Sequence, residues 1–579
     1  MGYPLKKWKD VTVDQGDVSQ LASSLGVSRV AAEILTGRGF KSADDAESYM
    51  NPKLSGLGDP FDIPGVRKAV DCIWAAIDAG KRIAVFGDFD ADGITSAALL
   101  VTLLQKLGAD AVPFLPDRQL DGYGMNMGPV KRCLSDCKPE LIISADCGTN
   151  SVEAVSYAME AGVEVVVTDH HEPQENVADP TALVNPKVAG ADDLKALAGV
   201  GVAFRLCHGI IKLALAEQRP ESQELDLRDW LDFVAVGTVA DIVPLTGENR
   251  ILVRYGLQKL NQYLESSNGR PCWDALRDTA KMNGAVEPYH IGFVIAPRLN
   301  SAGRLGSPVA ALDLLLSGNK ADALEKAMEL EDKNRKRRQI EASISKAAAK
   351  QIDEYFDEDK TFGIVAWAHE WHVGINGIVA SRLSSKYGRP VVVVAVDGDG
   401  KGVGSSRSIE CIDVLEALNG CADLLNSYGG HKMAAGLEVE EANLEAFRER
   451  FNEICAQKLR GQDLRSVQAV DSWVSLSELG DAVLQELDRM QPFGLDNPEP
   501  VLGVRGVTLA GKPKVIGKTQ DHIKMTVTAG GAQLEAVGFG LGAHKGPEGK
   551  LDMIFRLKDN TFRDQRLLQM HILDIRESA

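Results

Sequence analysis

The chain has 579 residues, of which 44% are hydrophobic and 25% are charged, a balance typical of folded globular proteins. It carries 64 Lys and Arg against 82 Asp and Glu, so its formal net charge is −18. This acidity excludes a protein that coats nucleic acid through uniform positive charge, but not an enzyme whose carboxylates bind metal ions. At roughly 100–200 residues per domain, the length predicts about three to five domains.

No targeting or membrane segment is expected from the sequence. Residues 1–7 lack the apolar region of a signal peptide, and no apolar stretch approaches the ~18 residues that span a bilayer. The longest uncharged run, residues 93–104, predicts a buried helix instead. The nine cysteines are scattered and form no C-x-x-C pair, which argues against zinc and for reduced thiols. We therefore expect a cytoplasmic protein.

The N-terminal half alternates short β-branched runs with helical patterns. After a helical lead segment, 1–64, this alternation predicts an α/β domain over 65–318 with a parallel sheet and right-handed crossovers. The part from about 197 to 316 is richer in helices. The expected strands, buried on both faces, are 82–86, 111–115, 141–144 and 163–167, and the expected helices between them are 94–107, 129–136 and 152–161.

Residues 319–356 predict one connecting helix, because no Gly or Pro interrupts them. A helix of about 35 residues is ~50 Å long, more than one domain needs, so we expect it to bridge two. Its basic cluster, Lys333 to Arg338, either lines a nucleic-acid channel or forms an ordinary solvated face; the sequence favours neither.

A second α/β unit is predicted over 357–461, and a β-domain over 462–579. The second unit opens with strands at 362–366 and 391–394, continues through the Gly-rich segments 401–407 and 428–436, and ends with a helix near Leu459. From 501 onward, short alternating strands with Gly and Asn turns suggest a small β-barrel. Residues 501–579 hold 12 Lys and Arg against 8 Asp and Glu, a net +4, so the other 500 residues carry −22.

Three acids follow the first predicted strand, at Asp88, Asp90 and Asp92. Their spacing suits metal ligation, because side chains two apart in an extended chain point to one side. A calcium loop of the EF-hand type is excluded, since Leu99 stands where a bidentate Glu is needed and a strand precedes the loop. A solvated acidic turn remains the alternative for this segment alone.

The next strands end in similar residues, Asp146 after one and Asp169-His170-His171 after the other. In an open parallel sheet, ligands bind beyond the carboxyl ends of the strands, so these groups should share one crevice. A further acid, Asp241, lies among apolar residues, where burial is costly unless the carboxylate is paired or binds a cation. Carboxylates with imidazole suit Mn²⁺ or Mg²⁺, and their number indicates two ions. Two such ions activate water and clamp a phosphoryl group, which predicts phosphoester hydrolysis.

These motifs resemble the DHH phosphoesterase superfamily, whose defining triplet stands here at residues 169–171. The resemblance covers nearly the whole chain, and the motif order is similar to that of the superfamily's bacterial single-stranded-DNA-specific exonucleases. It implies a DHH domain at 65–318, a DHH-associated domain at 357–461 and an oligonucleotide-binding (OB) barrel at 462–579. One departure is Asn376, where an aliphatic residue is expected. The supporting segments are 86–95, 144–148, 237–241, 297–305, 371–374, 404–407 and 429–436.

The resemblance also assigns roles to the site residues. The metal ligands would be Asp90, Asp92, Asp146, His170 and Asp241, with Asp146 able to bridge both ions. Asp88 and His171 would be supporting or substrate-facing groups, and Asp169 would orient the triplet. The phosphate-binding candidates are Arg118, Arg298, Asn300, Arg304, Ser405, Arg407 and His431; of these, Ser405, Arg407 and the region of Arg118 would anchor a 5′-phosphate, and His431 would either join them or cap a turn.

Aromatic side chains of the barrel are candidate base-stacking platforms, namely Phe539, Phe555 and Phe562. Aromatic residues of small barrels are core residues at least as often, so that alternative stays open for each of them.

We predict a Mn²⁺- or Mg²⁺-dependent exonuclease that degrades single-stranded DNA from the 5′ end to mononucleotides in repair and recombination. It would act as a monomer, with a single-strand-binding protein and a helicase as partners. One alternative is a small-substrate phosphoesterase of the same superfamily, such as an oligonucleotide or pyrophosphate hydrolase. Such chains are usually shorter and lack the terminal barrel. The other is a non-catalytic replication scaffold, which should have lost metal ligands.

Overall fold

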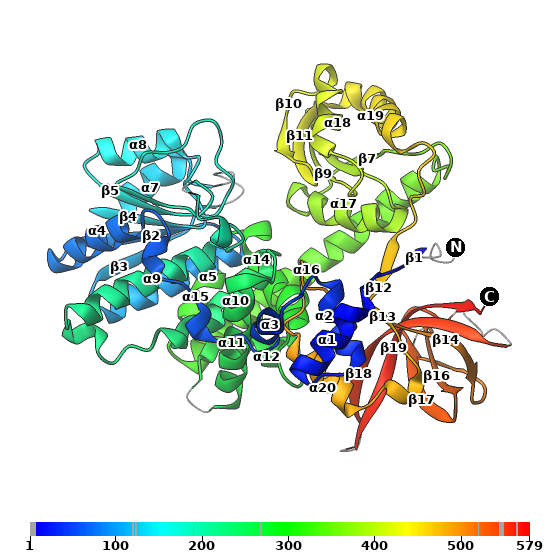
Figure 1. Cartoon of the computed structure of the whole chain (residues 1–579). Coiled ribbons are helices and arrows are strands. Elements are labelled where there is room, and N and C mark those ends of the chain that lie inside the picture. Colours follow the sequence, from blue (N-terminus) through cyan, green and yellow to red (C-terminus); the bar gives the residue numbers. More distant parts are fainter. Residues whose placement is uncertain are drawn as a thin grey trace. The chain divides into compact units, whose positions relative to one another are not determined.

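The computed structural model describes residues 7–578 apart from 118–120, 122–123, 189, 267–268, 519, 543–548 and 563–564. It divides into two compact units. The first comprises Met1–Asp59, Ile242–Tyr255 and Arg465–Ala579, and the second comprises Pro60–Asp241 and Gly256–Leu464. Figure 1 labels most of the elements. The predicted α/β class with a terminal β-barrel is confirmed, whereas the exact domain boundaries stay predictions.

A five-stranded parallel sheet of order β3-β2-β4-β5-β6 opens the second unit. Figure 1 shows α7 and α8 on one side of this sheet and α4, α5 and α9 on the other. The elements are α4 (Val66–Asp78), β2 (Arg82–Gly87), α5 (Ala91–Lys106), β3 (Asp110–Phe114), α7 (Met127–Cys137), β4 (Leu141–Ala145), α8 (Val152–Glu160), β5 (Glu164–Thr168), β6 (Ala182–Val184) and α9 (Gly199–Ala216). The four predicted strands are therefore confirmed, and β6 is a fifth that the sequence did not indicate.

Two details of the prediction were wrong. Strand β3 lies at the sheet edge and is only partly buried, because it has a neighbour on one side alone. Among the described residues, α9 is long and apolar enough to cross a membrane by length and composition, although no such stretch was expected. Because 72% of this helix is buried inside the protein, its composition is that of a core helix.

The predicted connecting helix is confirmed as α16 (Lys320–Asp353). Its first part packs against α12, α14 and α15, and its second part packs against β7 and α17. The basic cluster does not form a common exposed face, since Arg337 is buried and bonds to Asn334 and to Glu341 at 2.8 Å. The remaining helices before α16 are α10 (Leu231–Ala240), α11 (Gly247–Glu265), α12 (Pro271–Ala280), α13 (Pro288–His290), α14 (Ala296–Leu305) and α15 (Val309–Leu316).

A second sheet, of order β10-β11-β9-β8-β7, follows α16. Helices α16 and α17 cover one face of it, and α18 and α19 cover the other. The Gly-rich segments predicted in this unit are strands β9 and β10–β11. The elements are β7 (Ile364–His369), α17 (Val373–Tyr387), β8 (Val391–Val396), β9 (Lys401–Arg407), α18 (Val414–Asn419), β10 (Ser427–His431), β11 (Ala434–Glu440) and α19 (Leu444–Leu459).

The first unit contains the predicted barrel. Strands β14, β18, β19, β17 and β16 pair in that order, and the pairing of β14 with β16 closes the ring. Three N-terminal helices share the core of this barrel through Leu21, Ile34 and Met50, which the sequence did not indicate. The elements are β1 (Lys7–Asp10), α1 (Gln15–Leu25), α2 (Arg29–Gly37), α3 (Ala43–Met50), β12 (Val467–Val470), β13 (Ser472–Trp473), α20 (Asp481–Arg489), β14 (Leu502–Leu509), β15 (Lys514–Ile516), β16 (His522–Ala529), β17 (Ala532–Gly538), β18 (Leu551–Phe562) and β19 (Gln565–Glu577).

The three aromatic candidates of the barrel differ in exposure. Phe555 is fully buried in the core, so it is not a stacking platform. Phe539 is 57% exposed, and the rings of His522 and His571 meet it edge-on. The side chain of Phe562 lies outside the described residues.

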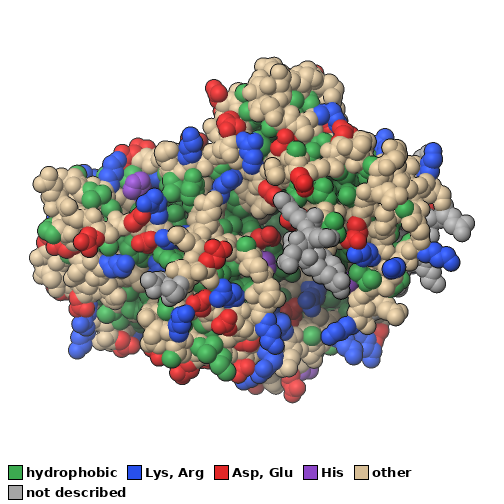
Figure 2. Space-filling model, turned by 90° about the horizontal axis from the view of Figure 1, so that it is seen from below, with side chains coloured by type: hydrophobic (Ala, Val, Ile, Leu, Met, Phe, Trp, Pro, Cys, Tyr) green, Lys and Arg blue, Asp and Glu red, His purple; other side chains and the backbone are tan. Residues whose placement is uncertain are grey.

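Charge is mixed over the visible surface. Figure 2 shows Lys and Arg interspersed with Asp and Glu on one face of the molecule. The net charge of −18 therefore does not form a single acidic block on this face.

Candidate metal centre

The carboxyl ends of β2, β4 and β5 bring the predicted acids and histidines together. Three overlapping groups have ligand atoms within 4.8 Å of one another: Asp88, Asp90 and Asp146; Asp92, His170 and Asp241; and Asp146, His170 and His171. Asp146 and His170 each belong to two of these groups. The structure therefore joins all five predicted metal ligands, and it places Asp88 and His171 just as close.

Local backbone structure positions the first three acids. Asp90 caps α5 by accepting hydrogen bonds from the N–H groups of Asp92 and Gly93, at 3.0 and 3.1 Å. This capping explains why the acidic turn ends where the helix begins. Asp88 is fully buried, and its Oδ2 has no hydrogen-bond partner among the described residues.

Helix α9 holds Asp92 from across the site. The two oxygens of Asp92 accept hydrogen bonds from the N–H groups of Gly199 at 2.7 Å and Val200 at 2.9 Å. A helix N-terminus favours a negative charge, so this contact orients the carboxylate. Glycine is required at 199, because a Cβ there would lie 2.4 Å from Oδ1 of Asp146.

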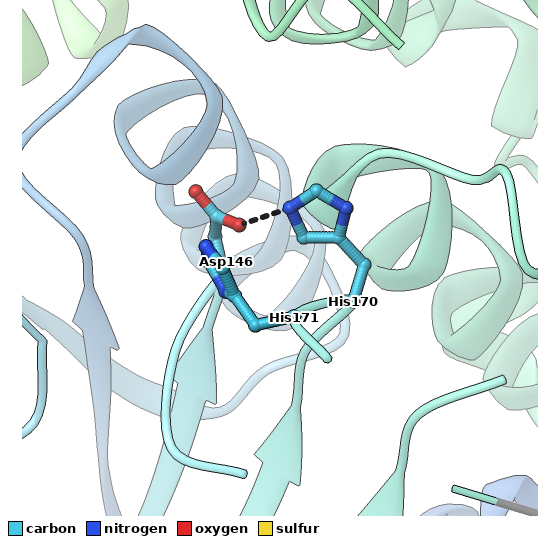
Figure 3. Close-up of side chains that lie close together, drawn as sticks. All are labelled: Asp146, His170 and His171. Carbon is cyan, nitrogen blue, oxygen red and sulfur yellow. Dashed lines mark ion pairs between the residues drawn. The ribbon is translucent and has the colours of Figure 1, made fainter. Parts of the chain in front are cut away.

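Asp146 and His170 face each other at the centre of the site (Figure 3). Nε2 of His170 lies 3.1 Å from Oδ1 of Asp146 and 3.5 Å from Oδ2 of Asp241. Asp146 adopts a left-handed backbone with φ 65°, which is uncommon outside glycine and is concentrated at functional sites.

Asp169 organises the histidine pair. Its Oδ1 accepts hydrogen bonds from the N–H of His170 at 2.7 Å and from Nδ1 of His171 at 2.7 Å, and its Oδ2 accepts one from the N–H of Thr149 at 2.8 Å. Burial alone would raise the pKa of Asp169, but the hydrogen bond and charge of His171 outweigh it and lower that pKa. Asp169 is therefore a charged group that fixes His171, and its role in orienting the whole triplet stays a prediction.

The two histidines differ in charge. Burial lowers the pKa of His170 to about 4, so its imidazole is neutral near pH 7. Burial opposes charging His171 as well, but the hydrogen bond to Asp169 raises its pKa to about 9. A neutral imidazole can ligate a metal, whereas a protonated one can donate to a phosphate oxygen.

The carboxylates of the cluster repel one another. Burial, followed by the charge of Asp90, raises the pKa of Asp88 to about 8 and that of Asp241 to about 7. Burial and neighbouring acids also raise the pKa of Asp92 and of Asp146 well above the ordinary value. Such a concentration of buried acids, including an oxygen of Asp88 that has no hydrogen-bond partner among the described residues, fits a site that is completed by cations.

The predicted substrate residues are more dispersed. Asn300 accepts a hydrogen bond from the N–H of Ala91 at 2.7 Å, so it supports the acidic turn. Arg298 is buried and pairs with Glu331 at 2.6 Å, and Arg304 donates to the carbonyl of Gly374 at 3.0 Å. Arg118 lies outside the described residues.

Ser405, Arg407 and His431 lie on the second sheet. Ser405 and Arg407 are half-buried at the end of β9, and His431 is exposed at the end of β10. The guanidinium of Arg407 lies over α17, where a Cβ at Gly377 would be 2.9 Å from its Nη2. The role of each in binding phosphate stays a prediction.

Sequence reasoning missed the chain that follows β6. Asn185 is fully buried and donates from Nδ2 to the carbonyl of His171 at 2.9 Å, and Lys187 comes two residues later. The available signal was the β-branched and apolar run Thr181–Val184 before Asn185-Pro186.

A parallel sheet with this acid and histidine set at its carboxyl edge defines a DHH phosphoesterase. Residues 82–238 match the DHH family, N-terminal domain; residues 360–457 match the DHHA1 domain; and residues 470–574 match the RecJ OB domain.

The whole chain is similar to a particular family. It is 34% identical to the single-stranded-DNA-specific exonuclease RecJ of Bacillus subtilis, over 98% of this chain and 70% of that protein. The crystal structure of Thermus thermophilus RecJ in complex with Mn²⁺ matches with a TM-score of 0.83 and 30% identity, over 99% of this chain and 80% of that one. The structure of the same protein in complex with Mg²⁺ matches with a TM-score of 0.76 and 28% identity, over 99% of this chain and 79% of that one. The chain belongs to the RecJ family.

Proposed function

We propose that this protein is a single-stranded-DNA-specific exonuclease that hydrolyses phosphodiester bonds from the 5′ end and releases mononucleotides in DNA repair and recombination. The observation that carries the proposal is the cluster of five aspartates and two histidines, buried or half-buried, in overlapping ligand-sized groups. The RecJ of Bacillus subtilis, to which 98% of this chain is similar, is a single-stranded-DNA-specific exonuclease.

Two divalent ions, Mn²⁺ or Mg²⁺, fit the donor set. Asp90, Asp92, Asp146, His170 and Asp241 would hold them, and Asp146 is the acid shared between two of the groups. Both ions have been found bound to the RecJ of Thermus thermophilus. When bound, they would supply activation of a water molecule and neutralisation of charge on the phosphate.

The chain's own residues orient this chemistry. Asp169 and the N–H groups of α9 fix the directions of His171 and Asp92, so these side chains need little reorganisation when substrate arrives. His170 stays neutral and keeps Nε2 available toward Asp146 and Asp241. Protonated His171 supplies a positive charge and an N–H donor for a phosphate oxygen.

Residues of the second sheet and the region of Arg118 would set the 5′-to-3′ direction of degradation. Ser405, Arg407 and His431 offer hydroxyl, guanidinium and imidazole groups, which together suit a terminal 5′-phosphate. In the barrel, exposed Phe539 is the described aromatic candidate that can stack on a base.

Cellular context completes the proposal. We expect a cytoplasmic monomer that works with a single-strand-binding protein and a helicase. All nine cysteines are free and seven are buried, which suits a reducing compartment.

End-labelled single-stranded and duplex DNA, incubated with the full chain and Mn²⁺, would test the proposal. Mononucleotides should appear from the 5′ end of the single strand, and Asp146→Ala should abolish their release. Release from duplex DNA at the same rate, release from the 3′ end, or an undiminished rate in the variant would overturn it.

A further inference from the structure

The chain that follows β6 runs alongside the histidine triplet. In the sheet, Thr168 of β5 pairs with Val184 of β6, and the N–H of Asp169 donates to the carbonyl of Val184 at 3.0 Å. Residues 185–187 therefore continue beside residues 169–171 at the carboxyl edge of the sheet, where ligands of parallel sheets bind.

Asn185 fixes this segment. Its buried amide donates to Oγ1 of Thr149 at 2.8 Å and to the carbonyl of His171 at 2.9 Å, while its Oδ1 accepts from the N–H of Lys187 at 2.9 Å. Each polar atom of the Asn185 side chain thus has a partner. These bonds tie the backbone of Lys187 to the same turn that carries His170 and His171.

The ammonium of Lys187 pairs with a residue next to the histidine triplet. Its Nζ is 3.1 Å from Oε1 of Glu172, the residue that follows the triplet. The Lys187 side chain is 21% exposed, whereas that of Glu172 is 68% exposed. The charge of Lys187 also reaches the cluster: after burial and His171, it helps to lower the pKa of His170.

An exposed carboxylate holds a lysine only weakly, because water and salt screen the pair. The ammonium can therefore exchange this partner for a phosphate, for which lysine serves as a flexible point charge.

We propose that Lys187 is a substrate-binding residue whose ammonium contacts a non-bridging oxygen of the DNA phosphate held at the metal centre. The proposal rests on the proposed function, since it takes a single strand as the ligand. Glu172 then serves as the resting partner of Lys187 in the free protein. The competing explanation is a purely structural ion pair between these two residues.

Four full-length variants separate these explanations. Lys187→Gln removes the charge, and Lys187→Arg keeps it. Glu172→Gln removes the resting partner. Lys81→Gln is the matched control, because Lys81 also pairs with an exposed acid, Glu164, at 2.8 Å, but the two residues stand at the amino ends of β2 and β5, opposite the edge that carries the metal centre. Thermal melting of each variant checks that it folds like the wild type.

Binding of a fluorescent oligo-dT with hydrolysis-resistant linkages is followed by anisotropy with Mn²⁺ at 50 to 400 mM salt, and turnover of unmodified oligo-dT is measured with Mn²⁺. Lys187→Gln should lower kcat/KM by about 10- to 100-fold, the scale of one hydrogen bond to a charged group. It should also reduce the slope of log K against log salt by about 0.7, the value for one phosphate contact on a single strand. Lys187→Arg should restore most of the loss in kcat/KM and in salt slope, and Glu172→Gln and Lys81→Gln should keep wild-type values.

Wild-type values for Lys187→Gln, or an equal loss in Glu172→Gln, would overturn the assignment while leaving the proposed function intact. A wild type that neither binds nor degrades single strands would overturn the proposed function, and this inference with it.

Discussion

The two five-stranded sheets of the second unit differ in strand direction and in the groups at their ends: the first is wholly parallel, whereas β8, β9, β11 and β10 of the second pair antiparallel. Strands β4 and β8 are both buried along their whole length, so each sheet has an apolar centre. The parallel sheet places Asp88, Asp146 and Asp169 at its carboxyl edge, all buried. The second sheet ends in hydroxyl, guanidinium and imidazole groups that are half-buried or exposed.

The acids at the end of the parallel sheet are buried, and their burial changes their pKa values. Desolvation and mutual repulsion raise the pKa values of Asp88, Asp92 and Asp146, so the parallel sheet is electrostatically incomplete without cations. In the second sheet, Arg407 instead has a partner within the chain, since its Nη1 donates to the carbonyl of Ser406 at 2.7 Å. The parallel sheet therefore carries repelling carboxylates that cations would offset, whereas Arg407 of the second sheet is already paired within the chain.

The largest expected effect comes from Asp146→Asn. Turnover of 5′-labelled single strands should fall by roughly 10²-fold or more, the scale of losing one preorganised charge-stabilising group. The metal-free variant should nevertheless melt at a higher temperature than the metal-free wild type, because a buried, repelled carboxylate has been replaced by a neutral amide. Turnover measured with Mn²⁺ tests the loss of activity, and thermal melting in EDTA tests the gain in stability of the metal-free protein.

Asp192→Asn is the matched control, since Asp192 is an exposed acid of the same unit. It should change neither quantity. A metal-free Asp146→Asn protein that melts below the wild type would contradict the claim that the cluster destabilises the empty site.

The second prediction concerns pH and metal. Asp88 and Asp241 have folded pKa values of about 8 and about 7 against an ordinary 3.8, so the folded protein binds protons that the unfolded chain releases. The stability from these protons is complete below pH 3.8 and is lost as the pH rises through 7 to 8. The melting temperature in EDTA should therefore fall between pH 6 and pH 8.5. Bound Mn²⁺ displaces these protons, so its stabilising effect should grow over the same range.

Melting curves at pH 6, 7 and 8.5, with Mn²⁺ or EDTA, measure this effect. In Asp88→Asn, the fall in EDTA should be smaller. A metal-induced shift that is independent of pH would show that the carboxylates are already charged in the empty site.

Much of the contrast between the two sheets could be predicted from the sequence, because it depends on residues that are neighbours in the chain. Each acid of the parallel sheet directly follows a run of apolar or β-branched residues, so the strand and the side chain at its end are read together. The long helix α16 was also predictable, since 34 residues without Gly or Pro leave few alternatives.

The features that could not be predicted from the sequence depend on contacts between residues far apart in the chain. The N–H groups of α9 meet Asp92 across 107 residues, and strand β6 has only three residues. Residue type alone also fails to give burial: Arg337 and Phe555 were candidates for binding DNA, yet each faces a core because of its register. The same limit applies to Asn185 and Lys187, whose contacts come from the pairing of β5 with β6.

The third prediction addresses the second sheet. Arg407→Ala should raise KM for 5′-phosphorylated single strands by about 10-fold and remove any preference over 5′-hydroxyl strands, because a charge-assisted contact is lost. Arg407→Lys keeps the charge but not the bidentate geometry, so its KM should lie between those of the wild type and Arg407→Ala. The melting temperature and its response to Mn²⁺ should stay unchanged. A variant that loses Mn²⁺ stabilisation would place Arg407 in the metal centre instead.

The smallest effect is expected at Asn376, which stands where the family resemblance predicts an aliphatic residue. Asn376 is fully buried, its Nδ2 donates to the carbonyl of Val403 at 3.2 Å, and its Oδ1 has no described hydrogen-bond partner. Leucine removes the unpaired oxygen along with one weak bond, so Asn376→Leu should be neutral or raise stability by up to about 1 kcal/mol. Asn452→Leu is the matched control, because Oδ1 of Asn452 accepts from the N–H groups of Phe362 and Gly363. Calorimetry should show a clear loss for Asn452→Leu alone, and an equal loss at both positions would mean that the Asn376 amide is needed by the fold.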